Sequence, residues 1–513
     1  MLRKIKPLIS KKLFLYVLSA VLLVLSFPRP NLFPLAWFAC VPWFIALEGR
    51  PKIEVFLFSC LTGIIFWLGI IYWLAHVTLL GMVIFILYLA LYFGIFGLAA
   101  SFFICRFSLF GLCSVSALWV ILEYVRSHLF TGFGWALLGY SQYLNLPVIQ
   151  IADSTGVWGV SFLVMLVNGA IYLAARSPRP LSVKIKIYIP VFFCALFVLA
   201  YGYYRLSPKP SLLARIPIKV AVIQGNIPQE LKWNKDAKDY ILEKYLALSE
   251  AASKENPDLI IWPEAALPVI PEEETGYYNI VAGSVRQRGV PLLFGAVTSR
   301  DKLYYNSALF LSSEGKLSGV YDKLHLVPFG EYIPLRNIFP FLETFAPIGD
   351  IEKGKDYTIF TLPGVSCFHP VEFSALICFE DLFPELSRGF VNRGADFLVN
   401  MTNDAWFKDT SAPYQHLQAS VFRAVENHIF LVRSANTGIS CFIRPDGQVI
   451  SLVKDAAGKD VFIFGYDAEV IAAYPGPLTF YTRYGDIFIF LLLIFNIYSI
   501  FHLKRYPADR LIR

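Results

Sequence analysis

About eight apolar runs, most of them close to twenty residues long, constrain the fold of this chain more than any other feature. A helix needs about 20 apolar residues to cross the hydrocarbon core of a bilayer, and each backbone amide there must be bonded within its own segment. The composition agrees, since 56% of the 513 residues are hydrophobic and 16% are charged, against about 25% charged in soluble domains. The runs, which we expect to be membrane-spanning helices, lie at about 13–27, 31–47, 53–75, 77–104, 111–126, 157–175, 186–204 and 486–502.

Basic residues gather beside alternate ends of these runs, which predicts their orientation. Lys and Arg follow the second, fourth and sixth runs and occupy both ends of the chain, whereas 127–156 contains neither. Cytoplasmic loops carry the excess of Lys and Arg, so both termini are predicted to be cytoplasmic. The net charge of +7 then reflects membrane topology, and we expect no nucleic-acid partner. A cleaved signal peptide in place of the first span is an alternative, but it would leave an odd number of spans and break the alternation.

This topology divides the chain into three parts. Residues 1–204 would form an N-terminal transmembrane bundle of seven spans. Residues 485–513 would form the eighth span and a cytoplasmic tail. Between them, 205–484 would be an extracytoplasmic domain with its flanking linkers.

The external segment alternates strand-like and helix-like patterns. Helices are predicted at 235–254 and 414–428, and a Pro-Asp-Gly hairpin turn at 445–447. Strands are predicted at 218–223, 259–262, 291–294, 307–311, 371–377, 397–400 and 430–432. Alternation of this kind predicts a layered α/β domain.

Cys378 stands at the end of one predicted strand, and Glu264 and Lys323 each follow another strand-like run. A thiol attacks only as the thiolate, so it needs a neighbouring base or positive charge. Glu264 would accept the thiol proton, and Lys323 would stabilise the thiolate and then an oxyanion. The backbone N–H of Phe379 would supply a second oxyanion donor. Such a site suits attack on an acyl carbon, followed by transfer of the acyl group from a thioester.

Each of these residues also has a simpler interpretation. A lone buried cysteine such as Cys378 usually packs in a core, Glu264 could cap a helix, and Lys323 could be a solvated residue at a strand end. In an oxidising compartment Cys378 could instead pair with Cys367 or Cys441, and those two either pair with each other or remain thiols. The presence of all three candidate residues in one segment favours the catalytic interpretation.

No metal or organic cofactor is expected. The sequence has no CxxC motif, which argues against a zinc site. The four histidines of the external segment show no ligand spacing, and we interpret them as structural: His325, His369, His416 and His428. The triad chemistry itself needs no cofactor.

Several motifs give the chain a resemblance to known families. They are 224–229 through Lys232-Trp233, 262–264, 321–334, 378–380 and 403–407. The external segment resembles the carbon–nitrogen hydrolase (nitrilase) superfamily, whose sites use a Glu-Lys-Cys triad in this chain order. The whole chain resembles the bacterial apolipoprotein N-acyltransferase family, which places such a domain between membrane spans. One departure is Phe379, where many members have Tyr.

The resemblance implies a fold, a location and a reaction. The fold would be an αββα sandwich attached to a bundle of membrane helices in the bacterial inner membrane. The reaction would be ping-pong: Cys378 takes an acyl group from a phospholipid donor as a thioester. The group then passes to the α-amino group of a diacylglyceryl-cysteine on an apolipoprotein acceptor, which is the final step of lipoprotein maturation. Glu264 would be the general base and Lys323 the transition-state stabiliser.

The resemblance also implies accessory residues. Glu331 would be a carboxylate near the triad, although a surface ion pair with Arg336 is the alternative. Glu380 and Trp233 are further positions that the family uses, but Trp233 could simply be an interfacial anchor.

An aromatic stretch follows Glu331. Phe339, Phe341 and Phe345 lie in 337–351, and such residues exposed to water would favour aggregation. We therefore expect these three side chains to face the bilayer and to guide an acyl chain toward Cys378. The loop 127–156 would cover the same entrance.

Two other functions compete with the acyltransferase interpretation. A membrane-anchored amidase or nitrilase acting on small amides explains the triad but not eight spans. A non-enzymatic transporter or scaffold that binds lipoproteins does not explain Glu264, Lys323 and Cys378 together. A trapped thioester on Cys378 would separate both enzymes from the scaffold, and the length of its acyl chain would separate the two enzymes.

Overall fold

The computed structural model describes residues 2–104, 108–176, 180–207, 216–333, 351–364, 370–473 and 476–505. The chain forms two compact units. One combines Met1–Ser207 with Tyr484–Arg513, and the other is Pro208–Arg483.

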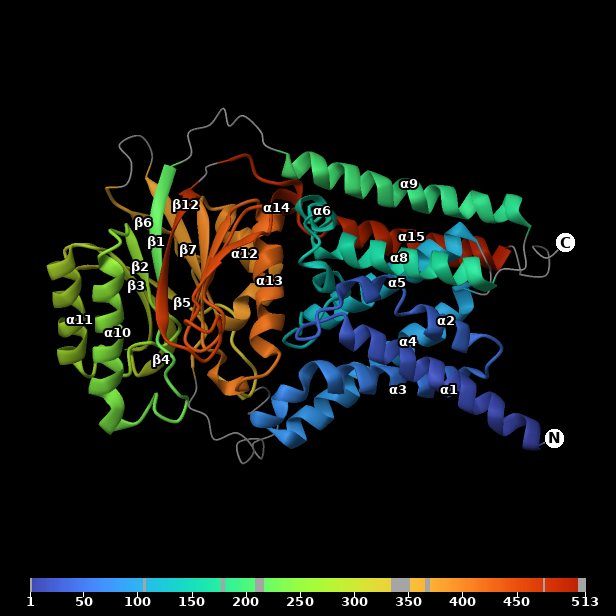
Figure 1. Ribbon diagram of the computed structural model, residues 1–513, viewed down its shortest axis with the longest axis horizontal. Helices are drawn as coiled ribbons and strands as arrows, with labels where there is room; N and C mark the ends of the chain where they lie inside the picture. The colour runs from blue at the N-terminus through green and yellow to red at the C-terminus, as the bar shows by residue number, and fades with distance from the viewer. Residues whose placement is uncertain are drawn as a thin grey trace. The chain divides into compact units, whose positions relative to one another are not determined.

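The first unit is helical. Its long helices are α1 (Leu2–Leu25), α3 (Lys52–Ile71), α4 (Leu79–Ile104), α5 (Leu109–His128), α8 (Val157–Arg176), α9 (Leu181–Leu206) and α15 (Ile487–Arg505). Shorter helices α2 (Val41–Leu47), α6 (Leu146–Ile149) and α7 (Ala152–Thr155) and the 3₁₀ helices η1 (Phe33–Trp37), η2 (Tyr72–His76) and η3 (Leu138–Gln142) connect them. Although α15 comes from the far end of the chain, it packs against α5 and α8 (Figure 1).

Five helical segments among the described residues are long and apolar enough to cross a membrane: Lys52–His76, Leu79–Ile104, Leu109–His128, Val157–Arg176 and Lys184–Leu206. They correspond to the third through seventh predicted runs. The apolar segments Phe33–Leu47 and Ile487–His502 are shorter. The total of eight spans therefore stays a prediction.

The described residues of the second unit form two six-stranded mixed sheets. The first has the order β12-β1-β2-β3-β4-β5 and the second has the order β11-β10-β9-β8-β7-β6. Each sheet contains three neighbouring parallel strands, β1, β2 and β3 in the first sheet and β7, β8 and β9 in the second. The strands next to them are antiparallel to them: β12 and β4 in the first sheet, and β6 and β10 in the second. The outermost strands β5 and β11 are antiparallel to β4 and β10. The first-sheet strands are β1 (Ile216–Gln224), β2 (Leu259–Ile261), β3 (Leu292–Arg300), β4 (Leu303–Leu311), β5 (Leu317–Asp322) and β12 (Gly465–Ala473). The second-sheet strands are β6 (Phe360–Leu362), β7 (Val371–Ile377), β8 (Phe397–Thr402), β9 (Phe430–Ala435), β10 (Cys441–Ile443) and β11 (Val449–Leu452).

Helices cover the outer faces of both sheets and give four layers. In Figure 1, α10 (Lys238–Ser253) and α11 (Thr275–Arg288) lie along one side, while α12 (Pro384–Val391) and α13 (Ala412–Asn427) lie along the other. The sheets face each other where β1 meets β9 and β4 meets β7. The remaining short helices are η4 (Lys235–Ala237), η6 (Cys378–Leu382), η7 (Asp404–Phe407) and α14 (Phe480–Tyr484). The predicted αββα sandwich is confirmed, as are the predicted strands and both predicted helices.

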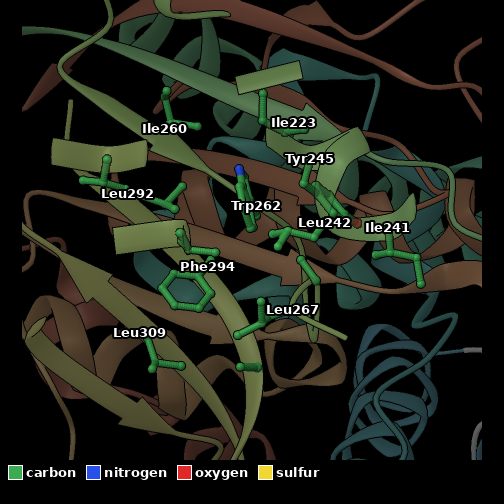
Figure 2. Close-up of a cluster of buried hydrophobic side chains, with 14 of the residues drawn as sticks. Ile223, Ile241, Leu242, Tyr245, Ile260, Trp262, Leu267, Leu292, Phe294 and Leu309 are labelled. Atoms are coloured by element: carbon green, nitrogen blue, oxygen red, sulfur yellow. The ribbon is translucent and has the colours of Figure 1, made fainter. Parts of the chain in front are cut away.

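The core beneath α10 fixes the segment that enters the candidate site. Figure 2 shows Trp262 at the centre of a buried cluster of side chains from α10 and from β1–β4, with Tyr245 and Phe294 beside it. The rings of Trp262 and Tyr245 stack at 5.1 Å between centroids, and Trp262 Nε1 donates to Ser249 Oγ at 2.7 Å. Since Trp262 directly follows β2, this packing fixes the position of the next residues, Pro263 and Glu264.

Candidate active site

Glu264 lies in the loop at the carboxyl end of β2. The loop packs so closely on β3 that a Cβ on Gly295 would meet the backbone nitrogen of Ala265 at 2.4 Å and Glu264 Cα at 2.8 Å. Ala265 adopts a left-handed backbone (φ 43°), which turns the chain immediately after the carboxylate. The Glu264 side chain is only 11% exposed, so its interactions are made within the domain.

Lys323 follows β5 and lies between two carboxylates. Its Nζ is 2.9 Å from both carboxylate oxygens of Glu331 and 3.7 Å from Oε1 of Glu264. Burial would lower the pKa of this ammonium, but Glu331 and then Glu264 outweigh burial and raise it. Lys323 is therefore a buried permanent cation. Glu331 forms an ion pair with Lys323. Arg336, the alternative partner of Glu331, lies outside the described residues.

Asn306 connects the two carboxylates, and the sequence interpretation missed it. From β4, its Nδ2 donates to Glu264 Oε1 and to Glu331 Oε1, each at 2.8 Å. Its backbone oxygen accepts from the Lys323 amide at 2.9 Å. Asn306 directly precedes the predicted strand 307–311, and its neutral amide gives no charge signal, which is why the sequence interpretation did not single it out.

Cys378 begins η6 at the carboxyl end of β7. It has a left-handed backbone (φ 54°), a conformation that costs free energy for any residue with a Cβ and that the surroundings must maintain. Burial raises the pKa of its thiol well above the ordinary value, Glu264 raises it further, and Lys323 opposes both. The resting group is therefore a thiol, and formation of the thiolate requires a base such as Glu264 to accept the proton.

Phe379 places its backbone N–H at the start of η6. The first N–H groups of a helix have no acceptor within that helix, so this donor is available beside Cys378. The Phe379 ring contacts Phe383, with 5.2 Å between centroids.

Glu380 joins the two strands that carry Lys323 and Cys378. Its Oε1 accepts from the Leu324 and His325 amides at 2.6 and 3.0 Å, and its Oε2 accepts from the Ile377 amide at 2.7 Å. The Tyr321 hydroxyl donates to both oxygens. Burial raises the pKa of Glu380 to about 7, against these hydrogen bonds and the charge of Lys323. Glu380 thus holds the backbone that follows β5 and the backbone that precedes Cys378.

Lys232 is a second buried lysine that the sequence interpretation did not single out. Its Nζ donates to the backbone oxygen of Glu264 at 3.0 Å, and burial lowers its pKa to about 8, opposed by Glu264 and Cys378. Its neighbour Trp233, which was singled out, is 51% exposed. The signal that could have found Lys232 was its place in the same motif as Trp233.

Other predicted residues are not brought into the site by the described structure. Phe339, Phe341 and Phe345 lie outside the described residues, as does Cys367. Cys441 is a buried free thiol on β10, and Cys378 is a partly exposed free thiol. The interpretation of Cys378 as a residue that simply packs in a core must therefore account for a partly exposed thiol on a strained turn.

Two family models divide the chain at the boundary seen in the fold. The apolipoprotein N-acyltransferase N-terminal domain matches residues 19–170, and the carbon-nitrogen hydrolase domain matches residues 219–475. The apolipoprotein N-acyltransferase of Geobacter metallireducens is 39% identical over 503 residues, which cover 92% of this chain and 91% of the relative. The chain belongs to the apolipoprotein N-acyltransferase family.

A second relative matches over a similar length, and a solved structure matches over about half of the chain. The apolipoprotein N-acyltransferase of Bradyrhizobium diazoefficiens is 31% identical over 516 residues, or 93% of this chain and 92% of the relative. Among solved structures, an amidase from Nesterenkonia sp. is 20% identical, with 54% of this chain and 96% of the amidase covered and a TM-score of 0.38. Every residue of the site described above lies within 219–475, the range that matches the carbon-nitrogen hydrolase model.

Proposed function

We propose that the chain transfers a fatty acyl group from a membrane phospholipid to the N-terminal amino group of a diacylglyceryl-cysteine on an apolipoprotein. The proposal is supported by the positions of Glu264, Lys323 and Cys378 after the carboxyl ends of β2, β5 and β7. It is also supported by the charges of Glu264 and Lys323, which act on the Cys378 thiol in a member of this family. A small-amide hydrolase would use the same three groups, but it gives no reason for five long apolar helices in the same chain.

The first half-reaction forms the thioester. Glu264 accepts the proton of the Cys378 thiol, and the sulfur attacks the ester carbonyl carbon of the phospholipid. The carbonyl π electrons move to oxygen, and the resulting oxyanion is stabilised by Lys323 and by the Phe379 N–H. When the oxyanion collapses, the carbon–oxygen ester bond breaks. The leaving alkoxide takes the proton from Glu264 and departs as a lysophospholipid.

The second half-reaction repeats these roles with a different nucleophile. The α-amino group of the acceptor attacks the thioester carbonyl, and Glu264 accepts a proton from the amine. Collapse of the oxyanion breaks the carbon–sulfur bond and releases the amide product. The Cys378 thiolate then takes the proton back from Glu264, which restores the starting state.

Lys323 contributes a fixed positive charge to both steps. Because Glu331 and Glu264 raise its pKa, Lys323 stays protonated and acts on developing negative charge without exchanging a proton. Glu331 and Asn306 are positioning residues, since they bond Lys323 and Glu264. Trp233, whose side chain is exposed, would act on substrate beside the buried Lys232.

The same proposal includes the topology. The chain would reside in the bacterial inner membrane with residues 1–204 and 485–513 spanning the bilayer, both termini cytoplasmic and 205–484 extracytoplasmic. The distribution of Lys and Arg supports this orientation. Phe339, Phe341 and Phe345 would guide the acyl chain, and the loop 127–156 would cover the entrance. No cofactor enters the chemistry.

Reconstitution tests the reaction. The purified full chain, placed in vesicles of phosphatidylethanolamine and phosphatidylglycerol, is given a synthetic lipopeptide with an N-terminal diacylglyceryl-cysteine. We expect an N-acylated lipopeptide and an equal amount of lysophospholipid, both absent with Cys378→Ala. A lipopeptide that remains unmodified while a small amide is hydrolysed would replace the proposal with the amidase alternative.

A further inference from the structure

A buried cluster of charged and polar side chains contacts the backbone carbonyl of Cys378, and no step of the proposed reaction uses it. It is built by residues from η6, β8, η7, α13 and β9 that are at most 2% exposed: Asp381, Asn400, Asp404, His416, Ser420 and Arg433. Buried charges are costly unless they are paired and hydrogen-bonded, so this cluster needs a structural or functional reason.

His416 occupies the centre of the cluster as a cation. Its Nε2 is 2.9 Å from Asp381 Oδ1, and its Nδ1 is 3.0 Å from Asp404 Oδ1. Arg433 lies against the same groups, 3.1 Å from Asp381 Oδ2, 3.4 Å from Asp404 Oδ2 and 2.8 Å from His416 Nδ1. Burial and Arg433 lower the pKa of His416, but the two carboxylates outweigh them and raise it to about 9. The two negative charges of the carboxylates then equal the two positive charges of the Arg433 guanidinium and the His416 imidazolium.

The carbonyl oxygen of Cys378 is the point at which this cluster meets the proposed nucleophile. Asn400 Nδ2 donates to this oxygen at 3.0 Å, and His416 Nε2 lies 3.3 Å from it. Asn400 is itself oriented by Arg433, whose Nη1 donates to Asn400 Oδ1 at 2.8 Å. Asn400 is therefore the closer donor to the carbonyl of a residue with a strained backbone, and His416 Nε2 shares its one hydrogen between this oxygen and Asp381 Oδ1.

The peptide bond that follows Cys378 transmits this arrangement to the next residue. A trans peptide is planar, with its C=O and N–H directed to opposite sides. Fixing the direction of the Cys378 carbonyl therefore fixes the direction of the Phe379 N–H. Hydrogen bonds in a chain also polarise one another, so donors on the carbonyl make that N–H a stronger donor.

We propose that His416 and Asn400 are positioning residues of the oxyanion hole. Both residues bond the carbonyl oxygen of Cys378 and so orient and polarise the peptide group between Cys378 and Phe379. The N–H of this peptide group, on Phe379, donates to the oxyanion. This inference rests on the proposed function, because it concerns the same tetrahedral intermediate. It also gives a reason why Phe379 needs no side-chain hydroxyl. The proposed oxyanion donor is the backbone N–H of Phe379, and His416 and Asn400 orient it through the Cys378 carbonyl.

Two reactions of Cys378 distinguish support of the oxyanion from a general loss of thiol reactivity. Acylation by a phospholipid passes through an oxyanion, whereas alkylation by iodoacetamide displaces iodide and develops none. The variants are His416→Gln and Asn400→Asp, the second of which keeps an acceptor for Arg433 but removes the donor on the carbonyl. Ser374→Ala is the matched control. Ser374, on β7, is buried like His416 and Asn400, but its hydroxyl donates to the backbone oxygen of Thr358 and not to the Cys378 carbonyl.

The full chain in phospholipid nanodiscs is followed by intact mass for the thioester and by peptide mapping for alkylation at Cys378. Outright loss of one oxyanion donor costs about 10²–10³-fold, so a misdirected donor is expected to slow acylation about 10–100-fold. Alkylation should change by less than about 2-fold, and Ser374→Ala should match the wild type in both.

Two results would overturn the inference: acylation at the wild-type rate in a folded variant, or an equal fall of acylation and alkylation. If His416→Gln does not fold, Asn400→Asp decides alone. A wild-type chain that is alkylated but never acylated would instead remove the proposed function, and this inference with it.

Discussion

Lys323 is bound more closely to Glu331 than to Glu264, with Nζ 2.9 Å from both oxygens of the first and 3.7 Å from Oε1 of the second. Glu331 is thus the main counter-ion of the buried ammonium. Glu264 keeps one oxygen bonded to Asn306 and remains available to accept a proton. The pairing therefore leaves Glu264, the proposed general base, outside the main ion pair of Lys323.

Glu331→Gln tests that pairing. Without its main counter-ion, Lys323 should approach Glu264, because the two side chains carry opposite charges. We expect thioester formation to slow about 10–100-fold, because Lys323 would leave the position from which it stabilises the oxyanion. Glu314→Gln, which alters an exposed pair with Lys316, is the control. An unchanged rate would mean that Glu331 has no part in the site.

Asn306→Asp tests the hydrogen bonds that Asn306 donates to Glu264 and Glu331. The variant replaces the donating amide by a third carboxylate, so both donated bonds are lost and like charges are brought together. Thioester formation should therefore fall about 10-fold or more. Asn234→Asp is the matched control, because Asn234 caps η4 at an exposed position and Asp caps equally well. A rate equal to that of the wild type would contradict the role given to Asn306.

Glu380→Gln tests the connection between the two sheets. A glutamine NH₂ cannot accept, so at least one of the Leu324, His325 and Ile377 amides would lose its buried acceptor. Such a loss costs about 1–3 kcal/mol. We expect a lower thermal midpoint of the full chain in nanodiscs and slower thioester formation, while Glu314→Gln leaves both unchanged. Equal midpoints for the wild type and Glu380→Gln would show that Glu380 does not hold the strand ends together.

His416 predicts a pH dependence of stability. Its pKa is about 6.5 when unperturbed and about 9 in the folded domain. A folded pKa above the unfolded value gives stability that is complete below pH 6.5 and is lost as the pH rises toward 9. The difference in thermal midpoint between the wild type and His416→Gln should therefore be largest below pH 6.5 and shrink by pH 9. A difference that grows over this range would have the wrong sign for an imidazolium.

The sequence was sufficient for the parts of the fold that follow local patterns. The run 371–377 predicted β7, and the apolar runs predicted the five long helices that could cross a membrane. The outer strands β6 and β12 were not predicted, because an edge strand is recognised by pairing with a distant partner: β12, for example, pairs with β1 across more than 200 residues. Periodicity within one window cannot report such a pairing.

The site divides in the same way. Glu264, Lys323 and Cys378 were found because each bears a reactive group at a strand end. Asn306 was missed because its importance comes from contacts with Glu264 and Glu331 that only the folded sheets create. His416 was interpreted as structural for want of ligand spacing, and its place beside the Cys378 carbonyl arises from packing of α13 on η6.

The central claim is that Cys378 carries the acyl group. The most direct measurement is the intact mass of the full chain purified from phospholipid membranes, with Cys378→Ala alongside. The account predicts a hydroxylamine-sensitive adduct of fatty-acyl mass on the wild type and none on the variant. An unmodified wild type after incubation with phospholipid, or the same adduct on Cys378→Ala, would contradict it.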